Sequence, residues 1–139
     1  SRKIVYLKTH TLTHTELINL KPLIIMIDFE KLIVNKKAKE YNKDVISFLN
    51  TADIDKVTNN QLRGPSLSRM LNIAEETGRF TKRNRRNFFV ISRGSLFECV
   101  SIFDYLHDIK KIDKAGFDLY YNKLDELSRI LFSLIRYIE

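Results

Sequence analysis

The residues with the clearest chemistry form a basic segment in the second half of the chain. Between positions 79 and 93 there are six basic residues and no acidic one, while the formal net charge of all 139 residues is only +7. The excess positive charge is therefore local, and a local positive field attracts polyanions. Arginine adds a forked donor that fits phosphate oxygens, so the segment predicts a contact with the backbone of nucleic acid, without base-specific reading. The predicted binding residues are Arg79, Lys82, Arg83, Arg85, Arg86 and Arg93.

A plainer interpretation of the same segment is a solvated corner between two helices. Charge runs of this kind often do no more than keep a helix end in water. Against this, the residues from Lys82 to Arg86 fall in the first turns of a predicted helix, where positive charge opposes the helix dipole by a few tenths to about 1 kcal/mol. This unfavourable placement suggests that the charges contact a partner outside the subunit. Arg93 lies further along the helix and is the weakest candidate of the six.

Carboxylates near the basic segment raise the alternative of acid–base catalysis. If the chain folds back on itself around Gly78, Glu75 faces the basic segment. Glu98 then faces Gln61 and Arg63, and we expect one of these two to pair with it. Each acid meets a basic or amide partner, which indicates structural pairing, and we predict no catalytic residue. The residues of this structural motif are Gln61, Arg63, Asn72, Glu75, Gly78, Gly94 and Glu98.

The remaining reactive side chains do not form a recognisable site. His10 and His14 have the i, i+4 spacing of a metal pair on a helix, but two ligands are too few for a closed zinc site, so we predict no metal. Cys99 lies on an apolar stripe and is expected to be a buried thiol, not a nucleophile. The sequence has no phosphate-binding glycine loop and no nucleophile elbow. We therefore predict no enzyme activity and no cofactor.

Four helices are predicted to position these residues. Asp28, Thr81 and Asp113 are the expected N-caps of the first, third and fourth helices. Gly64–Pro65 is expected to kink or divide the second helix, and Gly78 to end it. Short breaks join the helices, which is typical of an all-α, antiparallel up-down four-helix bundle. The predicted helices span residues 28–50, 55–77, 81–107 and 113–138.

Each long helix has apolar residues at alternating steps of three and four, the spacing of one buried face. Gly94 falls in the middle of the third helix, where glycine costs about 1 kcal/mol relative to alanine. We expect a neighbouring helix to approach Gly94 closely and offset this cost. The stripes hold Val34, Ala38, Tyr41, Val45 and Phe48 in the first helix, Phe89, Ser92, Leu96, Cys99, Phe103 and Leu106 in the third, and Phe117, Tyr120, Leu124, Leu127, Leu131, Leu134 and Ile138 in the fourth.

The chain length predicts one bundle domain, residues 27–139, preceded by an arm or extension, residues 1–26. The extension is Thr-rich and less clearly helical, and Met26 stands where a compact bundle would begin. The single cysteine cannot form an internal disulfide, which fits the reducing cytoplasm. No apolar run approaches the roughly 20 residues of a membrane span, so no membrane partner is expected.

Several short motifs resemble one known family. With the pattern N-I-A-E-x-x-G-R followed by G-S-x-x-E, the chain resembles the bacterial 23S rRNA intervening-sequence proteins, also called four-helix bundle proteins, over residues 29–139. Asn35 stands where that family usually has Trp, and Pro65 falls several residues earlier than the family's proline. The matching segments are FEKLIVNKKAKE at 29–40, QLR at 61–63, NIAEETGR at 72–79, RGSLFE at 93–98 and LIRYI at 134–138.

The resemblance implies an antiparallel four-helix bundle and a homo-oligomer, since relatives form five-membered rings. Those relatives include an accessory protein of diversity-generating retroelements, which is basic, binds nucleic acid and engages a reverse transcriptase. With the basic segment, this leads us to expect a non-enzymatic homo-oligomer, a pentamer by resemblance, that binds RNA or DNA or a nucleoprotein through the corner between the second and third helices. The alternative is a protein–protein adaptor whose ring binds an acidic partner protein.

Overall fold

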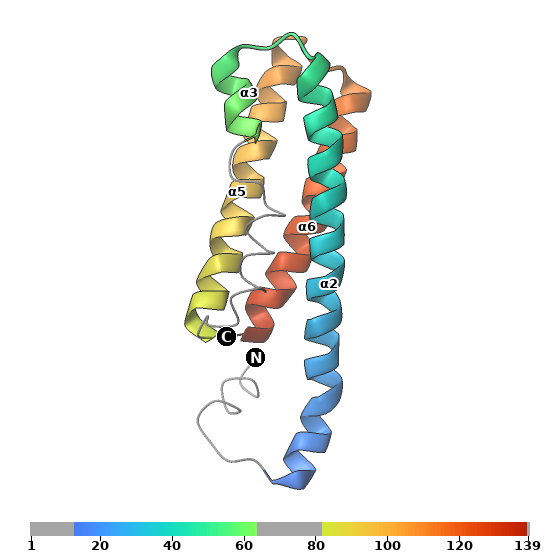
Figure 1. The fold of residues 1–139 in the computed structure, drawn as a ribbon, viewed down its shortest axis with the longest axis vertical. Coiled ribbons are helices and arrows are strands. Elements are labelled where there is room, and N and C mark those ends of the chain that lie inside the picture. Colours follow the sequence, from blue (N-terminus) through green and yellow to red (C-terminus); the bar gives the residue numbers. More distant parts are fainter. Residues whose placement is uncertain (1–12, 64–81, 139) are drawn as a thin grey trace.

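The computed structural model describes residues 13–63 and 82–138. In these two ranges the regular structure is helical and contains no strand, so this part of the chain is all-α, as predicted. Figure 1 shows α2 and α5 running in one direction and α6 running in the opposite one. α6 packs against both of the other long helices. The helices are α2 (His14–Thr51), α3 (Lys56–Arg63), α5 (Lys82–Asp108) and α6 (Lys114–Ile138).

Closure of these helices into a four-helix bundle depends on residues 64–81, which lie outside the described ranges. The antiparallel four-helix arrangement therefore stays a prediction. The predicted kink at Gly64–Pro65, the helix end at Gly78 and the Thr81 cap fall in the same range.

Two predicted helix starts are confirmed by their capping hydrogen bonds. The Asp55 carboxylate accepts a hydrogen bond from the backbone N–H of Thr58 at 2.9 Å, at the start of α3. The Asp113 carboxylate accepts one from the N–H of Gly116 at 2.8 Å, at the start of α6. Such bonds satisfy backbone donors that a helix leaves unpaired in its first turn.

The start of α2 differs from the prediction. The helix begins at His14, and Thr13 is its N-cap: the Thr13 hydroxyl accepts from the N–H of Glu16 at 3.2 Å, and the Glu16 carboxylate accepts from the N–H of Thr13 at 2.7 Å. This reciprocal pair is a capping box. Asp28 lies inside the helix, so its assignment as an N-cap is wrong. The helix also crosses the predicted boundary between arm and bundle, and that division stays a prediction.

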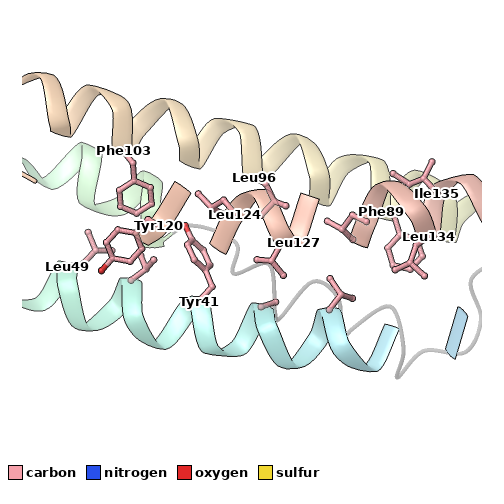
Figure 2. Packing of buried hydrophobic residues seen from close by; sticks show 14 of the residues in the cluster. Tyr41, Leu49, Phe89, Leu96, Phe103, Tyr120, Leu124, Leu127, Leu134 and Ile135 are labelled. Carbon is pink, nitrogen blue, oxygen red and sulfur yellow. The ribbon is translucent and has the colours of Figure 1, made fainter. Parts of the chain in front are cut away.

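The core follows the predicted apolar stripes. All of their members are buried except Phe48, Cys99 and Phe117, which are half-buried. Figure 2 shows side chains of α2, α5 and α6 meeting in one continuous layer. Near the turn between α5 and α6, the rings of Phe103 and Tyr120 stack with centres 4.6 Å apart and planes 7° apart. Burial of these apolar side chains away from water stabilises the packing of the long helices.

Gly94 does not mark a close approach between the described helices. It lies exposed on α5, and a Cβ built on it would have no heavy atom of the described residues within 4 Å. Within residues 13–63 and 82–138 the predicted close approach is therefore wrong. The core stripe of α5 passes through Ser92 and Leu96, and Gly94 lies on the outward face between them.

Candidate nucleic-acid interface

The basic segment lies at the first turns of α5. Arg83 is exposed, while Arg85 and Arg86 are half-buried, and Arg86 interacts with another group of the protein. Arg79 and the side chain of Lys82 lie outside the described residues. We call Arg83, Arg85 and Arg86 the basic corner. In Figure 1 this end of α5, drawn in yellow, lies beside the red C-terminal end of α6.

Arg93 is placed differently from the other basic residues. Its Nε donates a hydrogen bond to the Ser128 hydroxyl of α6 at 3.1 Å. Its guanidinium carbon lies 5.0 Å from the ring centre of Phe97 and 5.0 Å from that of Phe132. The structure thus places Arg93 in the seam between α5 and α6, and not in the basic corner.

A cluster of alternating arginines and phenylalanines follows from these contacts. Phe132 lies near a second guanidinium, that of Arg136, at 5.8 Å. Phe97 and Phe132 remain 53% and 45% exposed, although aromatic rings of this size normally gain most from burial. We call Arg93, Phe97, Phe132 and Arg136 the arginine–phenylalanine cluster.

The sequence reasoning missed Phe132 and Arg136 as functional candidates. A signal for them exists: no acidic residue occurs between Leu127 and Ile138. The two residues are spaced i, i+4 and lie beside the core stripe, so they share an outward face of α6. The sequence alone does not predict how α6 is rotated about its axis, and this rotation turns the outward face toward Arg93.

A pocket adjoins the cluster. It has a volume of about 290 Å³ and is lined by Phe132, Ser133, Arg136 and Tyr137. Beside it, the Tyr137 hydroxyl donates a hydrogen bond to Met26 Sδ of α2 at 3.7 Å. The volume is at the lower limit of the range for small-molecule sites, about 300–1,000 Å³. The pocket therefore suits one planar group better than a large cofactor.

The predicted pairing of Glu98 is wrong. The Arg63 guanidinium donates instead to the Asn59 side-chain oxygen at 2.5 Å and to that of Asn50 at 2.7 Å, which ties α3 to the end of α2. Glu98 is exposed and makes no ion pair with any residue of the described ranges. Gln61 is also exposed. Asn72, Glu75 and Gly78 lie outside the described residues.

The described ranges contain few side chains that could act as a nucleophile or bind a metal ion. Burial raises the pKa of the Cys99 thiol, so the protonated and poorly nucleophilic form is favoured. His14 is exposed at the start of α2, and His10 lies outside the described residues. Residues 13–63 and 82–138 contain no group of three or more side chains that could hold a metal ion. None of the helices in these ranges is long and apolar enough to cross a membrane.

A second exposed surface lies on the first half of α2. It consists of apolar side chains that are 55–66% exposed and recur at steps of seven, four and three along the helix, so they lie on one face. We call this set the α2 stripe, and it comprises Ile18, Ile25, Phe29 and Leu32.

Comparison with known proteins gives one family. A model of the family described as 23S rRNA-intervening sequence protein matches residues 30–133. The matched range includes the basic corner and most of the arginine–phenylalanine cluster, and it leaves out residues 14–29 of α2. No curated protein and no solved structure matches the chain.

Proposed function

Because the chain belongs to the 23S rRNA-intervening sequence protein family, we propose that it is a non-enzymatic, homo-oligomeric four-helix bundle protein that binds nucleic acid, either RNA or a nucleoprotein, through its basic corner.

The observation that carries this proposal is the separation of charge in the molecule. From Lys82 to Phe97 on α5, and from Leu127 to Ile138 on α6, every charged residue is basic. These two stretches are neighbours, because α5 and α6 pack against each other in opposite directions. A surface of one sign concentrates the field that attracts a polyanion and accelerates its association.

Homo-oligomerisation is supported by the α2 stripe. Contiguous apolar side chains on the outside of a protein usually mark a contact with another chain, and identical chains usually meet in closed symmetric assemblies. Five subunits are favoured by resemblance to ring-forming relatives.

The test is a pair of variants with the same change in charge. The Arg83→Gln/Arg85→Gln variant alters the basic corner, and Lys36→Gln/Lys39→Gln alters exposed lysines on α2. Arg86 stays unchanged because it already interacts within the protein. Affinity for mixed-sequence RNA and DNA is measured by fluorescence anisotropy at several salt concentrations.

We expect the corner variant to bind about tenfold or more weakly, and its log–log salt slope to flatten by about 0.7–0.9 for each phosphate that is no longer neutralised. The lysine variant should keep the parent's affinity and slope. Equal reductions of affinity in both variants would show that only total charge matters. Binding of an acidic protein, with no binding of nucleic acid by the parent, would instead support the adaptor function.

A further inference from the structure

We propose that the arginine–phenylalanine cluster is a stacking site for unpaired bases, so that the nucleic acid held by this protein is single-stranded. The inference rests on the proposed function, and it adds the class of nucleic acid and the second part of the binding surface.

The contacts within the cluster are those of a stacking surface. Arg93 lies 5.0 Å from both ring centres and is fixed by its hydrogen bond to Ser128. Phe97 and Phe132 therefore stand at set positions on two helices, each about half exposed. Nucleobases stack on aromatic rings and on guanidinium planes, and this works for any sequence because every base has a π-face.

The cluster continues the basic corner along α5. Arg83, Arg86, Val90, Arg93 and Phe97 recur at steps of three, four, three and four, so they lie on one face of the helix. The seven residues from Arg86 to Arg93 correspond to about 10 Å along the axis. A single strand of nucleic acid whose phosphates contact the basic corner would therefore extend along α5 to the arginine–phenylalanine cluster.

The facing stretch of α6 has matching chemistry. Arg129, Phe132 and Arg136 recur at steps of three and four. Of the two acids that precede this stretch, Asp125 pairs with Arg129 at 3.0 Å and Glu126 pairs with Lys37 of α2 at 2.7 Å. The pocket lined by Phe132, Ser133, Arg136 and Tyr137 offers rings, a hydroxyl and a guanidinium around a space suited to one base.

Two other occupants of this face are less consistent with its chemistry. A duplex keeps the faces of its bases inside the stack, so exposed phenylalanines gain little from it. A second copy meeting the same face about a two-fold axis would bring like charges together, which opposes association. The α2 stripe, which has no such charges, is the better contact between copies.

The first experiment compares single-stranded and duplex oligonucleotides of one sequence, as RNA and as DNA. The Phe97→Leu/Phe132→Leu variant keeps the apolarity of both side chains but removes the rings. We expect the parent to prefer the single strand, and the variant to bind single strands about tenfold or more weakly, with duplex binding and the salt slope unchanged.

The second experiment observes stacking directly. The chain contains no Trp, so Phe132→Trp introduces a single fluorophore at the cluster, and Leu119→Trp places one at the exposed opposite end of α6. A poly(U) or poly(dT) single strand should quench the fluorescence of the first variant and leave that of the second unchanged. This readout does not depend on whether the leucine variant folds.

The outcomes separate the two proposals. If the corner variant binds weakly while the leucine variant binds like the parent, and single strands do not change the fluorescence of the Phe132→Trp variant, the stacking site is wrong and the proposed function stands. If the parent binds neither single strands nor duplexes at low salt, both are wrong. If the leucine substitutions change the number of subunits and leave binding unchanged, the cluster is a contact between copies and the stacking site is wrong.

Discussion

At the scale of single residues, two titratable groups belong to or border the core: Tyr41 is buried and Cys99 is half-buried. Burial is the main cause that raises the pKa of the Cys99 thiol above its ordinary 9.0, and burial also raises the pKa of Tyr41 above its ordinary 10.0. Both groups are neutral when protonated, so the folded state holds their protons more tightly than the unfolded state does.

This difference predicts a loss of stability at alkaline pH. Below pH 9 both groups are protonated in the folded and unfolded states, and the stabilisation is fully present. As pH rises further, the unfolded chain releases these protons first, so the free energy of unfolding falls. Thermal unfolding between about pH 7 and pH 10.5 should show this loss, and Tyr41→Phe should reduce it. Tyr105→Phe, at an exposed tyrosine, should keep the parent's loss. An equal reduction by both variants would contradict the prediction.

The sequence predicts side-chain chemistry well within a segment and poorly between segments. The absence of acids near Arg83 is visible in the sequence, as is the stripe that buries Leu96. The contact of Arg93 with Phe132 joins residues 39 positions apart, and it depends on how α5 and α6 rotate against each other. For the same reason the Glu98 pairing failed: Arg63 bonds Asn59, one turn earlier on its own helix.

At the scale of elements, replacing each of two helix glycines with alanine is predicted to change stability in opposite directions. Gly94 has open space where a Cβ would be, and glycine is unfavourable inside a helix, so Gly94→Ala should stabilise the protein by about 1 kcal/mol. A Cβ on Gly116 would lie 2.8 Å from Ile112 Cγ1, an atom of a buried side chain, so Gly116→Ala should destabilise by about 1–3 kcal/mol. Urea unfolding of both variants measures the difference. A lower stability of Gly94→Ala would show a close contact at this exposed face.

The start of a helix was predictable where the spacing of apolar residues and a capping residue point to the same position. The start of α6 combines an aspartate cap with a clear stripe, α3 begins directly after the capping Asp55, and both starts were located. The start of α2 was missed although Thr13 and Glu16 have the spacing of a capping box. The helix continues through Pro22, a residue that usually interrupts helices, and its exposed apolar residues do not form a core-facing pattern.

At the scale of the whole molecule, the α2 stripe predicts the state of assembly. Phe29→Asp/Leu32→Asp places charges where we propose that copies meet, and burying them unpaired is costly, so the variant should be monomeric at micromolar concentration. Leu119→Asp, at an exposed apolar position on α6, should keep the parent's assembly. Light scattering distinguishes these states. If the parent protein is monomeric, the proposal of a homo-oligomer is wrong, and the proposal of nucleic-acid binding is unaffected.

The helices differ in length, and Figure 1 shows the blue end of α2 extending beyond α5 and α6. Its 38 residues correspond to about 57 Å, against about 40 Å for the 27 residues of α5. No described side chain between residues 14 and 29 is buried, whereas Val34 and Ala38 are almost fully covered. In a lone subunit the first four turns of α2 should therefore exchange their amide hydrogens with solvent much faster than the turns beyond Val34. Dilution of the assembled protein would then appear as a loss of amide protection confined to one end of a single helix.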